Sequence, residues 1–168
     1  FIPIFLLFVG ILIIYIYFNQ PTGKCDKELW KHVHNPKRLE IIKDCKTVSG
    51  IIKDIVSYEP DGDIHIKLKL DEQYKDLINK RNIEVQDGNL VVEVICYNLP
   101  IWPPALKSCL GYDNKVHVPF IGSHVTLSGS YVLDKEQELL EHGWMEIHPV
   151  TSIKVDWIKT AKYWLSLI

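Results

Sequence analysis

The sequence predicts a mainly β protein in which an N-terminal transmembrane helix precedes a five-stranded Greek-key barrel of the OB type with short flanking helices. Three observations lead to this prediction. The first eighteen residues carry no charge, and five later segments alternate apolar and polar residues with the period of two that half-buried strands show. Gly50 and Gly129 lie inside two of these segments, where a tightly curved strand needs a residue without a side chain. A β-sandwich is the alternative fold.

The uncharged segment, FIPIFLLFVGILIIYIYF, predicts a transmembrane helix over residues 1–20. Eighteen helical residues cover roughly 27 Å, which is close to the hydrocarbon thickness of a bilayer. A cleaved secretory signal is the alternative. Its apolar region is typically about 7 to 15 residues long and is followed by small residues at the cleavage site. The residues that follow here, Asn19, Gln20 and Pro21, show no such pattern.

The elements after this segment follow in a simple order. Residues 21–45 are expected to form a juxtamembrane helix and a linker, because Asn35 and Pro36 end a short helical pattern. Residues 46–155 are expected to form the barrel, with strands and one helical stretch at 47–56, 63–70, 72–80 (helical), 90–97, 123–133 and 144–153. Residues 156–168 are expected to form an amphipathic helix with Lys159 and Lys162 on its polar side.

Composition excludes one class of partner and gives no sign of catalysis. The formal net charge is −2, and Arg38 and Arg81 are the two arginines of the chain. Nucleic acid is therefore not an expected partner, since its binding needs a basic surface and guanidinium groups for phosphate. The sequence contains no nucleophile elbow, phosphate loop or metal-ligand motif. We therefore predict no catalytic residues and expect a protein that is not an enzyme.

Four cysteines without a CxxC pair disfavour a zinc ribbon and thioredoxin-like redox chemistry. Disulfides are the favoured interpretation, and short loops favour pairing Cys25 with Cys45 and Cys96 with Cys109. Each closed loop is worth about 3 kcal/mol in the chain-entropy model. Disulfides would place the domain on the extracytoplasmic side of the membrane. Four reduced, buried cysteines in a cytoplasmic domain are the alternative.

Six stretches of the chain form a recognisable set: WKHVHNPKRL, CKTVSGI, PDGDIHIKLKLD, GNLVVEVIC, GSHVTLSGSYVLD and HGWMEIHPVTSI. With them, the chain resembles a group of uncharacterised single-OB-domain proteins of archaea and bacteria that are membrane-anchored or exported. The resemblance spans nearly all of the chain after the first segment. It implies the OB fold and no assigned activity, because one fold hosts many functions.

If the second, third and fifth strands lie side by side, their outer face gathers a candidate metal site. Its predicted ligands are His65, Glu93, Glu146 and His148, with Asp61, Asp63 and His142 in adjoining loops. Two imidazoles and two carboxylates suit a divalent zinc, copper or iron ion, and no other cofactor is expected. The alternative is structural. The aspartates would cap a turn, and the histidines would form hydrogen bonds across the strands.

Two apolar segments predict contacts with a partner or a membrane. The loop 98–119 contains four prolines and presents Leu99, Ile101 and Trp102. Such a loop suits a partner surface or the bilayer interface, with a lid on one end of the barrel as the alternative. The C-terminal helix carries Trp157 and Trp164, which suit a membrane surface or a partner helix, with packing onto the barrel as the alternative.

These observations predict a single-pass cell-membrane protein with an extracytoplasmic OB-type domain. We expect this domain to be a binding or accessory module, a non-catalytic subunit of a hetero-oligomeric membrane complex. In an archaeal cell, a membrane enzyme such as a copper monooxygenase is one assembly of that kind. The competing expectation is a metal-binding protein or a metal-dependent hydrolase that uses the His and Glu residues above. A third is a free-standing OB module that binds oligosaccharide or peptide.

Overall fold

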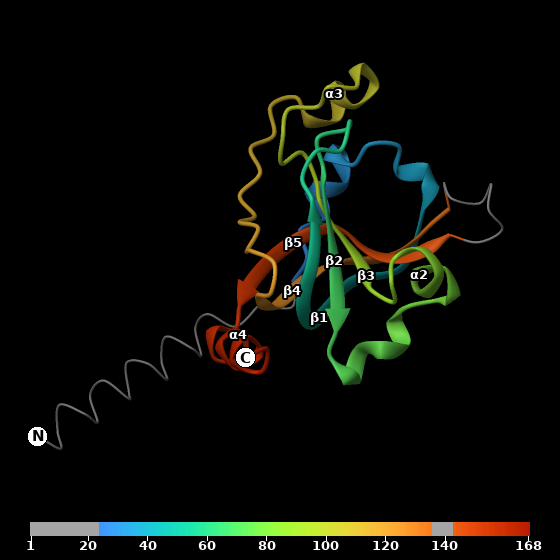
Figure 1. Cartoon of the computed structure of the whole chain (residues 1–168). Helices are drawn as coiled ribbons and strands as arrows, with labels where there is room; N and C mark the ends of the chain where they lie inside the picture. Colours follow the sequence, from blue (N-terminus) through green and yellow to red (C-terminus); the bar gives the residue numbers. More distant parts are fainter. Residues whose placement is uncertain (1–23, 136–142) are drawn as a thin grey trace, which may run out of the picture.

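The structure is a computed structural model that describes residues 24–135 and 143–168. Five strands close into a barrel in the order β1-β2-β3-β5-β4 (Figure 1). They are β1 (Leu39–Val56), β2 (Ile64–Leu70), β3 (Leu90–Val94), β4 (His124–Asp134) and β5 (Trp144–Val155). The prediction of a mainly β protein with five strands is therefore confirmed. Because the strands form one closed barrel, the alternative of a two-layer sandwich is wrong.

The barrel closes through β1, which pairs antiparallel with β2 along one edge and with β4 along the other. β2 is antiparallel to β3, and β4 is antiparallel to β5. The pair β3 and β5 is parallel, with Val91 opposite Glu146. The other four pairings of the barrel are antiparallel. The parallel pair places the middle of β3 beside the middle of β5, where the candidate site lies.

Inward-facing aliphatic side chains fill the barrel and form its core. Fully buried examples on four different strands are Val48, Leu68, Val92 and Leu127. A Cβ atom on Gly129 would lie 2.4 Å from the carbonyl oxygen of Pro149. β4 and β5 therefore approach so closely that only glycine fits there, as expected for a tightly curved strand.

β1 begins at Leu39, inside the stretch 21–45 that was expected to be a helix and a linker. Its first half pairs with β4, and the register shifts between Ile41 and Lys43 and again between Lys43 and Lys46. Such bulges interrupt the alternation of side chains. The period-two pattern therefore becomes readable only from residue 47, although the strand starts earlier.

The helices are short. They are η1 (Lys27–His32), η2 (Pro36–Arg38), η3 (Glu72–Leu77), α2 (Lys80–Val85), α3 (Pro103–Cys109) and α4 (Trp157–Leu165). The predicted helical stretch 72–80 divides into η3 and the start of α2. The helix α3 was not predicted, because two adjacent prolines suggested a loop. Proline is compatible with the first turn of a helix, and both prolines lie there.

The segment that carries η1 and η2 covers the outward face of the barrel and forms a second, smaller core with it. This outer core consists of Leu29, Val33, Leu39, Ile95, Cys96 and Val132. The indole N–H of Trp30 donates to Ser130 Oγ at 3.0 Å, which fixes η1 on β4. Outward-facing side chains of β3, β4 and β5 are consequently buried, although they do not belong to the barrel interior.

Two disulfides join Cys25 to Cys45 and Cys96 to Cys109, as predicted. The first ties the start of the covering segment to β1, and the second ties α3 to the end of β3. No cysteine among the described residues is free.

The predicted transmembrane segment, residues 1–20, lies outside the described residues. Among the helices of residues 24–135 and 143–168, none has the length and apolar composition that a membrane span requires.

The C-terminal helix α4 packs against the start of β4 through buried polar contacts. Thr160 Oγ1 accepts the main-chain N–H of His124 at 2.9 Å. Asp71 receives a hydrogen bond from Ser49 Oγ at 2.5 Å, and its carboxylate lies 3.0 Å from His124 Nε2 and 3.5 Å from Lys159 Nζ. Burial alone would raise the pKa of Asp71, but the hydrogen bonds from Ser49 and His124 lower it below its ordinary value. The ionised carboxylate therefore stabilises the attachment of α4.

Replacing Asp71 with asparagine is expected to lower the free energy of unfolding by about 1 kcal/mol near neutral pH. Because the folded-state pKa is depressed, this contribution is present above the ordinary value of 3.8 and is lost as the pH falls through the folded-state pKa. Urea unfolding of the parent and the variant should be measured near neutral pH and in acid below 3.8. The difference in free energy of unfolding between them should be smaller in acid. Asp54→Asn, at an exposed position of β1, serves as the control. An equal effect of pH on the stability of this control would contradict the role given to Asp71.

Candidate functional site

Asp63 is positioned by a tight turn immediately before β2. Gly62 has φ +89°, and a Cβ atom there would lie 2.5 Å from the carbonyl oxygen of Asn98, so the turn requires glycine. Asp61 Oδ1 accepts the main-chain N–H of Asp63 at 3.2 Å. Asp63 Oδ1 in turn accepts the N–H of Cys96 at 2.7 Å. The carboxylate of Asp63 is thereby fixed beside the end of β3.

Glu93 lies at the centre of the site, between two imidazoles. His65 on β2 stands directly opposite it in the register, and His65 Nε2 lies 2.6 Å from Glu93 Oε1. His148 on β5 approaches from the other side, with Nδ1 at 2.6 Å from Glu93 Oε2. Neither carboxylate oxygen completes a well-directed hydrogen bond. The contacts of Glu93 are thus mainly electrostatic.

Glu146 supports His148 from the same strand. Glu146 Oε1 lies 3.1 Å from His148 Nδ1, and Glu146 Oε2 accepts the indole N–H of Trp144 at 3.0 Å. Two carboxylates therefore face Nδ1 of His148. The other nitrogen, Nε2, is buried and has no hydrogen-bond partner among the described residues.

These five residues, Asp63, His65, Glu93, Glu146 and His148, are called the acid–imidazole cluster below. Arg38 borders it from η2. Its guanidinium forms an ion pair with Asp134 on β4, and Nη2 lies 3.6 Å from Glu93 Oε2. The sequence alone gave no sign that Arg38 reaches the cluster, because it comes from the covering segment and not from a strand.

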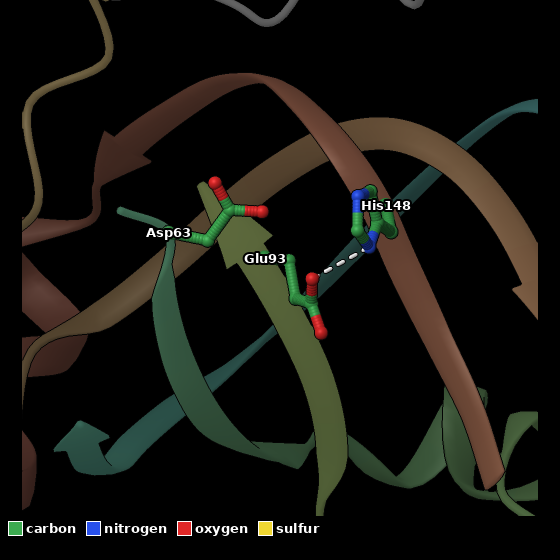
Figure 2. A group of neighbouring side chains, drawn as sticks. All are labelled: Asp63, Glu93 and His148. Atoms are coloured by element: carbon green, nitrogen blue, oxygen red, sulfur yellow. Dashed lines mark ion pairs between the residues drawn. The ribbon is translucent and has the colours of Figure 1, made fainter. Parts of the chain in front are cut away.

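The structure brings together all four predicted metal ligands. Figure 2 shows two of them, Glu93 and His148, beside Asp63. The four lie on the outward face of the strands, as expected. Glu93, Glu146 and His148 are nevertheless fully buried, because the covering segment seals this face, and only His65 keeps appreciable exposure. Asp61 contributes to the turn, while His142 lies outside the described residues.

The electrostatics separate the carboxyl groups of the cluster. Burial would favour neutral Glu93, but His148 and His65 hold its pKa well below the ordinary value. Burial raises the pKa of Asp63 to about 7 and that of Glu146 to about 6, and the charge of Glu93 adds to both shifts. Glu93 is therefore the ionised centre of the cluster. Asp63 and Glu146 take up a proton more readily, because nearby positive charge does not offset their burial.

Both imidazoles hold a proton strongly. Burial alone would lower the pKa of His148, but Glu93 and Glu146 raise it to about 10. Glu93 likewise overcomes the effect of burial on His65 and raises its pKa to about 9. At neutral pH, three carboxyl groups thus face two imidazolium groups, while Arg38 is shared with Asp134.

The burial of the cluster limits the chemistry that it can perform. Surface hollows of about 510 and 630 Å³ are lined by other residues, chiefly the segment 112–117 with its neighbours. A substrate needs access to a reacting group, and Asp63, Glu93 and His148 are at most 2% exposed. The arrangement suits a buried ion or an ion-pair network better than hydrolysis.

The predicted contact residues lie on two separate surfaces. Leu99 and Ile101 are more than 80% exposed, and Trp102 is half-exposed beside His34. Trp157 and Trp164 are exposed on α4. In Figure 1, α3 with its loop lies at the top and α4 at the lower left, so the structure does not bring the two groups together.

The chain was compared with protein-family models, with curated proteins and with solved structures, and it shows no match in any of the three. The resemblance to single-OB-domain proteins therefore stays a prediction, and any function must be argued from the residues themselves.

Proposed function

We propose that this chain is a single-pass membrane protein whose extracytoplasmic OB-type barrel is a non-catalytic binding subunit of a hetero-oligomeric membrane complex. The length of the uncharged segment 1–18 supports the anchor. The two disulfides support the extracytoplasmic side, since such bonds persist in oxidising compartments. The closed five-stranded barrel supports the OB assignment.

The observation that carries the binding role is the rigid apolar loop, residues 97–110. The main-chain N–H groups of Ile101 and Trp102 both donate to the carbonyl of Pro60, at 3.0 and 2.9 Å. Asn98 is held to Gly62 and Ser57, and the Cys96–Cys109 bond closes the loop. A segment that is already ordered loses little conformational entropy on binding.

This held loop displays apolar side chains to solvent. Leu99, Ile101 and Leu110 are each more than 80% exposed, although the backbone that carries them is fixed. A hollow of about 510 Å³ adjoins Leu99 and is lined by polar side chains that include Asp113, Lys115 and His117. An apolar centre with a polar rim is the composition of a protein–protein interface, which favours a protein partner over the bilayer itself.

The test is gentle detergent extraction of native membranes, followed by size separation and mass spectrometry. We expect the chain to resist extraction without detergent and to migrate with a larger assembly. The double change Leu99→Asp and Ile101→Asp should release it to its own mass. Ile83→Asp removes another exposed aliphatic residue, on α2, and should leave the assembly intact.

Migration of the parent chain alone, or an assembly that survives the double change, would contradict the proposal. Release by Ile83→Asp as well would show that any exposed charge disrupts the assembly and that the loop has no special role.

A further inference from the structure

We propose that Asp63, Glu93 and His148 bind one divalent transition-metal ion inside the acid–imidazole cluster. Each residue offers a ligand atom, and the three atoms lie within 4.8 Å of one another. Ligand atoms about 2.0–2.2 Å from a shared zinc ion lie roughly 3–4 Å apart, so small side-chain shifts complete the site. Figure 2 shows the three side chains turned toward one another from the start of β2, from β3 and from β5.

The independent sign of a ligand is Nε2 of His148. This atom is completely buried and has no hydrogen-bond partner among the described residues, a state that a protein interior rarely leaves uncompensated. In Figure 2, the ring edge that carries both nitrogens faces the two carboxylates. An ion that displaces the Nε2 proton would bind the lone pair of this nitrogen and so satisfy the atom.

The surroundings of His148 are those of a metal-bound histidine. Such a histidine donates its other N–H to a carboxylate, which fixes the tautomer and the ring orientation. Here Nδ1 forms its hydrogen bond with Glu146 Oε1 at 3.1 Å, and Trp144 holds Glu146 in turn. Trp144 and Glu146 are thus positioning residues. Neither oxygen of Glu93 completes a well-directed hydrogen bond, so Glu93 can turn Oε2 from Nδ1 toward an ion held by Nε2.

A dication also balances the charge of the cluster. Asp63, Glu93 and Glu146 provide three negative charges when ionised, and His65 provides one positive charge. With a divalent ion and neutral His148, the sum is zero. The donor set of two carboxylates and one imidazole, with all four cysteines engaged in disulfides, favours zinc or manganese over a soft ion.

Isothermal titration of the full disulfide-bonded chain in detergent, after metal removal with EDTA, tests the site with ZnCl₂ as the probe. We expect saturable binding of one ion per chain and a higher unfolding temperature with zinc than without. Asp63→Asn keeps the acceptor for the Cys96 N–H and removes the charge. It should weaken zinc binding at least about 100-fold.

Asp61→Asn is the matched control, since it removes the same charge two residues away and keeps the turn. It should bind zinc as the parent does. Without metal, Asp63→Asn should unfold at the parent's temperature or above it, so that lost binding cannot be ascribed to misfolding. Absence of one-to-one binding by the parent, or equal affinity in Asp63→Asn, would overturn the proposal. Zinc binding at an exposed histidine outside the cluster, such as His117, would give this equal affinity.

Discussion

Replacing Glu93 with alanine is expected to lower the free energy of unfolding by about 3–5 kcal/mol, the loss typical when one partner of a buried ion pair is removed. Glu93 is the shared partner of His65 and His148, each at 2.6 Å, and Arg38 lies 3.6 Å away. Its removal takes the nearest carboxylate from both imidazolium groups and, among the described residues, leaves only Glu146, at 3.1 Å, as an ion-pair partner of buried His148. Urea unfolding of the disulfide-bonded chain in the presence of EDTA measures the effect apart from any metal.

Glu59→Ala is the control for this experiment. Glu59 contacts the same His65 from the solvent side, at 4.0 Å, and is itself partly exposed. Exposed pairs contribute about 0–1 kcal/mol, so this change should have a small effect. A similar loss for the two variants, or a loss below about 1 kcal/mol for Glu93→Ala, would mean that Glu93 is not the electrostatic centre of the cluster.

The double change Cys25→Ser and Cys45→Ser is expected to destabilise the chain by about 3 kcal/mol, because the bond closes a loop of 20 residues in sequence separation. We expect a local effect as well. The bond fixes the start of the covering segment, so its loss should raise amide hydrogen exchange in η1 (Lys27–His32) and η2 (Pro36–Arg38), as measured by mass spectrometry.

The second disulfide provides the comparison. Removing Cys96–Cys109 opens a loop of similar size, with a separation of 13, and should cost a similar free energy. Its increase in exchange should be confined mainly to the apolar loop 97–110. Equal exchange of the covering segment in both double variants would show that Cys25–Cys45 does not hold this segment in place.

Much of the barrel could be predicted from the sequence, because a clean alternation of apolar and polar residues reports directly on a strand with one buried face. Ile64 to Leu70 is the clearest case. The start of β1 was missed because bulges interrupt the alternation, and α3 was missed because its prolines resemble those of a loop. In both places, local irregularity conceals an element that tertiary packing stabilises.

The candidate site shows a similar division. The placement of His65, Glu93, Glu146 and His148 on one face followed from strand periodicity and an assumed strand order. The burial of Glu93, Glu146 and His148 could not be predicted in this way. It depends on how η1 packs across β4 and β5, and the sequence of η1 does not indicate which strands it covers. Arg38 was likewise hidden, since an arginine in a short linker gives no sign of the buried carboxylates that it contacts.

The two disulfides join residues that are close in sequence, whereas closure of the barrel pairs residues that are far apart in sequence. Each disulfide joins neighbouring segments, whereas closure requires Leu39 at the start of β1 to meet Asp134 at the end of β4. Long-range pairing is slow, because a large loop must close before any contact compensates for its entropy. Both sulfur bridges can therefore form during synthesis, before β4 and β5 exist. A chain oxidised in this order would begin closure of the barrel with the residues before η1 already tethered to β1.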